Sequence, residues 1–407
     1  MVGKTVVPTS TVWDKAVVAS AFQEAGVKPS HLATLYKHLV KHPEAAWEDV
    51  PNLPRAAVQL LNERFTHLTT SVLHRQTSSA ADTTKLLLKL QNGMQIEAVI
   101  MHYDTTASAQ EVDEDASAAD DVASTSGRSH TAGHQRATLC VSSQVGCIMG
   151  CTFCATGTMG LKEDLSAGEI LEQLVHAQRV TPIRNVVFMG MGEPMNNYDQ
   201  VVSAVHMMID PQIFALRRSA ITISTVGVIP RMLQMVTDLP GVSLALSLHA
   251  PTQELRKTIV PSAKAYPLDK LMAAVDRYHM QTRQKVFVEY VMLARVNDSE
   301  EQAHQLGALL QGRAVVLNLI PWNPVYSPEF EFEAPGPKRT DLFQGIVRQY
   351  SVHCTVRQEK GQDISGACGQ LVVQHASSQG CSSGTHRDME DMIPHRSEPA
   401  VTNLVAS

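Results

Sequence analysis

Three closely spaced cysteines constrain this chain more than any other feature. Cys147, Cys151 and Cys154 lie in the glycine-bearing segment 144–157, just after an apolar segment, Thr138 to Ser143, that is predicted to be a strand. The spacing C-x3-C-x2-C supplies three thiolates, which suit zinc or an iron–sulfur cluster. No fourth cysteine or histidine follows closely, whereas a structural zinc site normally has four protein ligands. The fold must therefore wrap one short loop around a metal centre.

Two interpretations of this metal centre remain open. Zinc would need a fourth ligand from elsewhere, such as Cys140 or Cys368. A 4Fe-4S cluster on three thiolates would leave one iron open to a small molecule. The same spacing after a strand is typical of radical S-adenosylmethionine (SAM) enzymes, in which the open iron binds the amino and carboxylate groups of SAM. We favour the 4Fe-4S cluster with bound SAM. In such a site these cofactors supply the difficult chemistry.

Composition limits the class of protein. The chain has 407 residues, enough for a large core and an accessory domain. Its seven cysteines are an odd number and are clustered, which favours a reducing compartment and metal or catalytic use. No apolar run is long enough to cross a membrane, and no secretory signal is evident. We expect a cytoplasmic monomer, with an organelle as the alternative location.

The N-terminal region is predicted to be a helical accessory domain, residues 1–80. Apolar residues recur at helical spacing from Val12 to Ala25, His31 to Lys41 and Pro54 to Gln76. Basic residues are scattered over this region, which indicates either a solvated face or an RNA-binding face. Asn92-Gly93 between two apolar runs then predicts a β-hairpin within residues 81–103, with Glu97 on its second strand.

Two polar segments are predicted to be disordered. Residues 104–136 are acidic, rich in Ser and Ala, and nearly free of large apolar residues, so they have little surface to bury. They carry most of the net charge of −6, so a basic face on the folded part remains possible. Residues 377–407 have a similar composition and are expected to form a loose tail.

Between these segments, residues 137–376 alternate six predicted strands with helices. Ser166 and Glu169 predict a capping box at the start of one helix, and Asp298 with Glu301 suggests another cap. Such alternation predicts an α/β fold with a parallel sheet and right-handed connections. We favour a partial (β/α)6 barrel of the TIM type; a flat doubly wound sheet is the alternative. In both folds the site lies at the carboxyl ends of the strands.

Polar residues do follow the predicted strands. The turn Gly190-Met-Gly-Glu-Pro194 follows the second strand and allows close approach of a ligand, while Glu193 can accept hydrogen bonds from an ammonium group. Similar polar positions at later strand ends are suited to the SAM carboxylate, ribose or adenine; they are Ser224, Ser247, His249 and Asn323. In a loop after the last strand, Cys368 is a candidate nucleophile. Cys140 and Cys354 lie on predicted strands, where packing is the simpler explanation.

These residues also carry a family resemblance. The chain resembles the RlmN/Cfr radical SAM methyltransferases, which methylate adenine in RNA. The matching segments run from the hairpin to about residue 372; they are Thr138 to Cys147 with the following cysteines, Met189 to Pro194, Ser247 to Pro251, Glu289 to Met292, Asn297-Asp298, Asn318 to Pro324 and Ala367 to Leu371. The helical N-terminus is similar to the accessory domain of the family. The long insertion between Glu97 and Cys140 departs from its pattern.

The resemblance implies a two-step reaction. One SAM methylates the cysteine matching Cys368; a second SAM on the cluster yields the radical that takes hydrogen from this methyl group. The methylene then adds to an adenine carbon, Cys140 releases the product through a disulfide with Cys368, and Glu97 accepts a proton. The implied SAM contacts are Gly192, Glu193, Ser224, Ser247, Leu248, His249 and Asn323. The RlmN type methylates C2 of adenine in ribosomal or transfer RNA, and the Cfr type methylates C8.

The resemblance also implies binding partners and leaves alternative functions open. RNA and an electron donor such as flavodoxin or ferredoxin are the expected partners. The rival functions are C8 methylation, action on transfer RNA alone, a radical SAM reaction on a small molecule, and a metal-bearing RNA-binding protein without catalysis. A pure binder needs neither Cys368 nor Cys140, so their presence favours an enzyme.

Overall fold

The computed structural model describes residues 10–103, 136–325 and 331–372. These residues belong to one compact unit, Met1–Val373. The predicted tail and nearly all of the predicted acidic insertion lie outside the described residues. Within the described ranges, no helix is long and apolar enough to cross a membrane.

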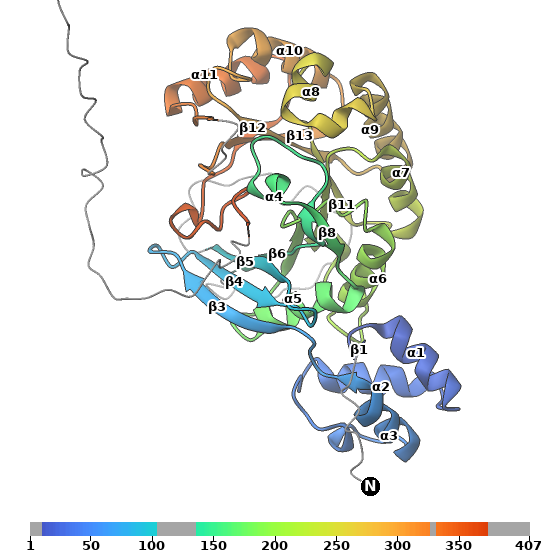
Figure 1. Cartoon of the computed structure of the whole chain (residues 1–407). Coiled ribbons are helices and arrows are strands. Elements are labelled where there is room, and N and C mark those ends of the chain that lie inside the picture. The colour runs from blue at the N-terminus through green and yellow to red at the C-terminus, as the bar shows by residue number, and fades with distance from the viewer. Residues whose placement is uncertain (1–9, 104–135, 326–330, 373–407) are drawn as a thin grey trace, which may run out of the picture. The chain divides into compact units, whose positions relative to one another are not determined.

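A ten-stranded sheet forms the centre of the molecule, as Figure 1 shows. Its strand order is β14-β13-β12-β11-β10-β9-β6-β5-β4-β3, and every pairing from β6 to β14 is parallel. The parallel strands are β6 (Arg136–Cys140), β9 (Asn185–Phe188), β10 (Ile221–Thr225), β11 (Ser243–Ser247), β12 (Val286–Met292), β13 (Val315–Pro321) and β14 (Cys354–Val356). The prediction of a mixed α/β fold with a parallel sheet is confirmed.

Helices connect the parallel strands and follow the sheet along one side in Figure 1. They are α5 (Ala167–Gln178), α6 (Tyr198–Ile209), α7 (Ile229–Asp238), α8 (Gln253–Ile259), α9 (Leu268–Thr282), α10 (Glu300–Leu310) and α11 (Pro337–Arg348). The predicted capping box of Ser166 and Glu169 opens α5. The second predicted cap is wrong by one residue: Ser299 caps α10 with Gln302, because the Ser299 hydroxyl accepts from the Gln302 backbone N–H.

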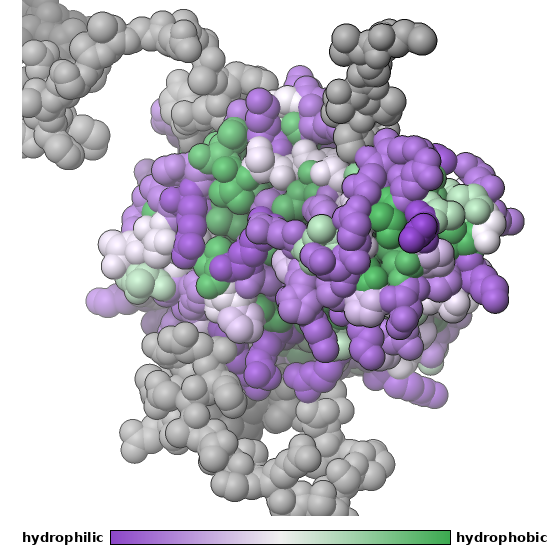
Figure 2. All heavy atoms as spheres, turned by 90° about the horizontal axis from the view of Figure 1, so that it is seen from below, coloured by the Kyte–Doolittle hydropathy of each residue, from purple (hydrophilic) through white to green (hydrophobic). Residues whose placement is uncertain are grey.

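The N-terminal part is helical only as far as Arg64. It contains β1 (Ser10–Thr11), α1 (Lys15–Glu24), α2 (Ser30–Leu39), α3 (Arg55–Arg64) and β2 (Phe65–Thr66). The predicted helix to Gln76 is wrong, because β3 (Ser71–Thr77) is an edge strand of the central sheet. Ladder hydrogen bonds to β4 decide the structure of this exposed segment. Figure 2, seen from below, shows a largely hydrophilic surface on this side.

The hairpin is present as predicted. Strands β4 (Thr83–Lys89) and β5 (Gln95–Tyr103) flank the turn at Gly93, and β5 pairs antiparallel with β6. Tyr103 pairs with Arg136, so the two ends of the insertion are neighbours in the sheet. Val99 pairs with Cys140, which places Glu97 on the strand beside Cys140 despite the long insertion.

A buried carboxylate joins the N-terminal part to the core. Glu172 on α5 is fully buried and accepts hydrogen bonds from the backbone N–H groups and hydroxyls of Thr69 and Thr70 at 2.5–3.1 Å. His176, one turn later, lies 2.9 Å from the Thr70 hydroxyl. These bonds fix the segment that leads from the N-terminal helices into β3. Burial raises the pKa of Glu172, and the surrounding hydrogen bonds oppose this shift.

Replacing Glu172 with alanine should destabilise the protein strongly. The substitution leaves several buried donors without an acceptor, so we expect the free energy of unfolding to fall by about 3 kcal/mol. Urea denaturation of the full chain measures this change. Glu301→Ala on α10 removes an exposed carboxylate and should change stability by less than about 0.5 kcal/mol. Equal stabilities of the two variants would contradict the role assigned to Glu172.

Candidate active site

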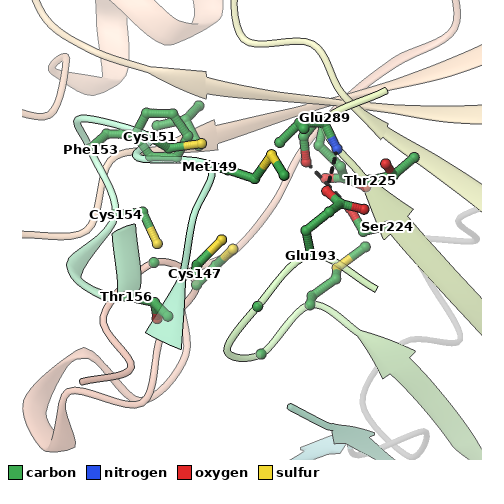
Figure 3. A pocket seen from close by; sticks show the side chains of 18 of the residues that line it. Cys147, Met149, Cys151, Phe153, Cys154, Thr156, Glu193, Ser224, Thr225 and Glu289 are labelled. Atoms are coloured by element: carbon green, nitrogen blue, oxygen red, sulfur yellow. Dashed lines mark hydrogen bonds between the residues drawn. The ribbon is translucent and has the colours of Figure 1, made fainter. Parts of the chain in front are cut away.

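A cavity opens at the carboxyl ends of the parallel strands. The cysteine loop forms one wall, and Glu193, Ser224 and Thr225 from strand ends form the opposite wall, as Figure 3 shows. The predicted residues that line it are Cys147, Cys151, Cys154, Gly192, Glu193, Ser224, Ser247, His249 and Cys368. The others, which are Cys140, Glu97, Leu248 and Asn323, are not part of its lining. The structure thus brings most of the predicted site together from separate segments.

The cysteine loop is held by a small two-stranded sheet and a single helical turn. Strand β7 (Gln144–Cys147) pairs with β8 (Gly160–Asp164), and α4 (Ala155–Thr158) begins just after Cys154. Gly146 has a φ of 77°, and a Cβ there would lie 1.9 Å from the Gly160 carbonyl oxygen. Only glycine permits this approach of the two strands.

The donor chemistry of the loop suits an iron–sulfur cluster. Burial raises the pKa of Cys147 to about 12 and also raises the pKa values of Cys151 and Cys154. Thiolates in such a place require nearby positive charge, which iron supplies on binding. Within the described part of the chain, no group of His, Cys, Asp or Glu is arranged around a single metal ion. Each thiolate of a cluster binds a different iron, so these sulfur atoms need not converge on one point.

Glu193 on the opposite wall is fixed by backbone donors. Its two carboxylate oxygens accept from the N–H groups of Met195 and Val226 at 3.0 and 2.9 Å. The side chain is buried, which raises its pKa, while the bond from Val226 opposes the shift. Gly192 has a φ of 100°, and a Cβ there would lie 2.6 Å from Gln144. The turn therefore places a rigid acceptor in the cavity.

Two more strand ends contribute hydroxyls and an imidazole. The hydroxyls of Ser224 and Ser247 lie 3.3 Å apart. His249 adopts a φ of 60° and accepts from the Val291 N–H through Nδ1 at 3.0 Å, so the neutral ring carries its proton on Nε2. Burial, with a smaller contribution from the Arg256 charge, lowers the pKa of His249 to about 3. His249 is thus a neutral donor at the cavity wall.

The loop that carries Cys368 closes over the same cavity. Cys368 is exposed, yet surrounding protein raises the pKa of its thiol to about 11, which Arg357 opposes. Asn323 donates to the Cys368 carbonyl at 3.0 Å, and Gly369 accepts from the Ala155 N–H at 2.8 Å. Asn323 therefore positions the loop here, and its contact with SAM stays a prediction. The loop sets a protonated thiol beside the cysteines.

The expected disulfide between Cys140 and Cys368 is absent, since both are free cysteines. Cys140 is buried on the central strand β6, whereas Cys368 belongs to a separately anchored loop. The two thiols nevertheless lie within electrostatic range, because Cys368 contributes to the raised pKa of Cys140, about 12, after burial as the main cause. The structure therefore shows both thiols free, and the expected disulfide belongs only to the product-release step.

Glu97 is tied to both ends of the Cys368 loop. Its carboxylate lies 3.0 Å from the Lys85 ammonium group, and it accepts from the Val372 N–H at 2.9 Å. Lys85 also donates to the Ser365 carbonyl at 3.3 Å. Burial raises the pKa of Glu97, and Lys85 opposes the shift. A buried ion pair on the hairpin thus contacts both flanks of the segment that carries Cys368.

Sequence reasoning assigned no role to Glu289 and Arg357, which also belong to this region. Glu289 lines the cavity, is buried on β12, accepts from Asn318 at 3.0 Å and lies 3.8 Å from Arg357. Glu289 raises the pKa of Arg357, which directly follows β14. A lone carboxylate in the apolar run Val286–Met292 and an arginine after the last strand were the available signals.

Known proteins match both the fold and the motifs. The family model of the radical SAM superfamily matches residues 141–306. A ribosomal RNA large subunit methyltransferase N from Nitrosopumilus maritimus is 39% identical over 333 residues, covering 79% of this chain and 86% of the relative. A dual-specificity RNA methyltransferase RlmN from Psychrobacter arcticus is 35% identical and covers 93% and 90%. A crystal structure of a radical SAM methyltransferase from Sphaerobacter thermophilus has a TM-score of 0.77 at 32% identity, covering 89% and 99%.

The parallel sheet with a three-cysteine loop at its carboxyl edge, together with the matching family model, defines a radical SAM enzyme. Membership of this superfamily implies a 4Fe-4S cluster and SAM, and the loop has the donor set for such a cluster. Over most of its length, the chain belongs to the RlmN family of radical SAM RNA methyltransferases.

Proposed function

We propose that this protein methylates C2 of an adenine in RNA through a methylated Cys368. The observation that carries the proposal is that exposed Cys368 lines the same cavity as the three loop cysteines and Glu193. Relatives at 35–40% identity are named as dual-specificity RNA methyltransferases. Ribosomal and transfer RNA are the proposed substrates.

The proposed cofactor contacts follow from the cavity walls. Cys147, Cys151 and Cys154 would hold the cluster, and Glu193 would accept from the SAM amino group. Ser224, Ser247 and His249 offer donors to its carboxylate or ribose. When bound, the cluster supplies the electron that converts SAM into a 5′-deoxyadenosyl radical, with flavodoxin or ferredoxin as the proposed donor class.

Each remaining step is assigned to a side chain. Cys368 would lose its proton and attack the methyl group of one SAM. The new C–S bond forms as the bond from this methyl group to the SAM sulfur breaks, and S-adenosylhomocysteine leaves as a neutral thioether. Its methyl group later loses a hydrogen atom to the radical from a second SAM and bonds to the adenine carbon. Glu97 is proposed to accept the proton released from that carbon. Cys140, as a thiolate, would then attack the Cys368 sulfur, so that a transient disulfide forms as the S–CH2 bond breaks. The released carbon takes up a proton to become the methyl group, and the one unpaired electron left on the disulfide would return to the cluster.

The architecture supports RNA as the partner. The N-terminal helices are fixed to the core by Glu172, and the surface on their side is mainly hydrophilic. We propose that residues 1–80 help to bind RNA and that the chain acts as a monomer in the cytoplasm or an organelle. Parallel pairing throughout β6 to β14, with helices between the strands, supports the partial (β/α)6 barrel.

Product analysis tests the function directly. Anaerobically reconstituted protein is incubated with SAM, dithionite and total RNA, and the digested RNA is analysed by mass spectrometry with separation of the 2- and 8-methyl isomers. The expected product is 2-methyladenosine. An 8-methyl product would replace the C2 assignment with C8. Deoxyadenosine without methylated adenosine would refute an RNA substrate.

A further inference from the structure

Arg256 is a fully buried arginine with an unusual charge environment. It lies on α8 (Gln253–Ile259) and its exposed fraction is 0%. None of the ion pairs formed among the described residues includes it. A buried charge without an opposite charge is strongly unfavourable, so natural sites seldom keep one. The surrounding structure should therefore indicate what compensates it.

Its hydrogen bonds provide only part of that compensation. Arg256 Nε donates to the Leu248 carbonyl at 3.1 Å, and Nη2 donates to the carbonyls of Val226 and Ser247 at 2.5 and 3.3 Å. These carbonyls lie at or beyond the carboxyl ends of β10 and β11, behind the cavity wall. Carbonyl oxygens satisfy donors but carry no net charge. The guanidinium thus joins two strand ends and retains its full positive charge.

The third nitrogen of the guanidinium has no partner. Nη1 is buried and without a hydrogen bond in the described structure. Arg256 also lines a small side cavity. Met149 and Val226 line both this cavity and the main one, so only a thin wall separates them. A buried donor without an acceptor indicates that a polar or charged group belongs nearby.

The cysteine loop is the neighbour of this charge. Met149, which lies between Cys147 and Cys151 in the loop, lines the side cavity together with Arg256. The last residue of α8 is in direct contact with the loop, because the Thr152 N–H donates to the Ile259 carbonyl at 3.0 Å. The helix that carries Arg256 is therefore fixed to the loop between Cys151 and Cys154.

We propose that Arg256 is the built-in counter-charge of the cluster, acting from behind the cysteine loop. The inference rests on the proposed function, because it requires a cluster on the three cysteines. A four-iron core held by three thiolates is an anion, and reduction adds one electron and one further negative charge. A fixed cation beside it stabilises the reduced form more than the oxidised form. Arg256 thus raises the reduction potential without touching the reacting atoms.

The test compares three variants of the full chain after anaerobic reconstitution. Arg256→Gln removes the charge and keeps two N–H donors, whereas Arg256→Lys keeps the charge and loses the planar set of guanidinium donors. Lys257→Gln is the control, because it removes an exposed charge on the same helix. Iron and sulfide per chain are measured first. The midpoint potential is then measured by a dithionite titration followed by electron paramagnetic resonance.

We expect the potential to become more negative in Arg256→Gln, and to stay near that of the wild type in Arg256→Lys and Lys257→Gln. If Arg256→Gln binds little iron, retention of the cluster by Arg256→Lys supports the counter-charge. Loss of the cluster in both Arg256 variants, or an unchanged potential in Arg256→Gln, overturns the inference. A wild-type protein that binds no cluster would instead refute the proposed function.

Discussion

Cys368→Ala protein is expected to lose methyl transfer to RNA and to keep reductive cleavage of SAM. The thiol is the proposed acceptor of the first methyl group, and alanine cannot form the C–S bond. Losing a nucleophile that forms a covalent intermediate typically lowers turnover by roughly a thousandfold or more. The three cysteines and Glu193 are unchanged in this variant, so the cluster and bound SAM should persist. Methylated adenosine and 5′-deoxyadenosine are measured in the same reaction.

Cys354→Ala is the matched control, because it removes a thiol of the core strand β14 that does not line the cavity. It should retain most of the methylation activity. Methylation by Cys368→Ala at the rate of this control would exclude the methylated-cysteine route. Loss of both products in Cys368→Ala, with iron retained, would indicate that the Cys368 loop is needed to bind SAM.

Cys151→Ala should have the opposite pattern, with loss of iron, of deoxyadenosine and of methylated RNA together. Two remaining thiolates leave another iron without a protein ligand, and the affinity for the cluster falls. Bound iron and sulfide, visible absorbance and both products report this loss. Cys140→Ala serves as the control for iron content, since Cys140 lies on β6 and outside the cavity lining.

Full iron content in Cys151→Ala would mean that another side chain had replaced the ligand. Cys368 is the candidate, because it is the other cysteine in the lining of the cavity. The double variant Cys151→Ala with Cys368→Ala would then decide the matter, because a cluster that survives both changes must take its third ligand from outside the four cysteines that line the cavity. Together, the Cys368 and Cys151 variants separate the methyl acceptor from the metal ligands.

Much of this site could be predicted because it depends on local pattern. Short apolar runs followed by glycine or polar residues marked the strand ends, and parallel strands bring their carboxyl ends to one edge. Ser166 with Glu169 marked the start of α5 through a purely local hydrogen-bonding pattern. Features that depend on four or five neighbouring residues could therefore be predicted without knowledge of tertiary contacts.

The rest depended on contacts between distant segments. The sequence of β3 has a helical pattern of apolar residues, but ladder hydrogen bonds to β4 determine its structure. The role of Asn323 could not be foreseen, because its partner is a backbone carbonyl 45 residues later. Glu289 and Arg357 acquire significance only when β12 and β14 are brought to opposite sides of β13.

The pairing of Tyr103 with Arg136 has a consequence for how this family can vary in length. The two residues that flank the intervening segment are partners in the last pair of one antiparallel ladder. For a segment that makes no contacts of its own, added length enters only through loop-closure entropy, about 0.6 kcal/mol for each doubling. Glu97 and Cys140 lie on the two strands that the segment joins, so their spacing is set by the ladder. Extra residues between these two strands therefore change the free energy of folding little, and they leave Glu97 and Cys140 in the same relative positions.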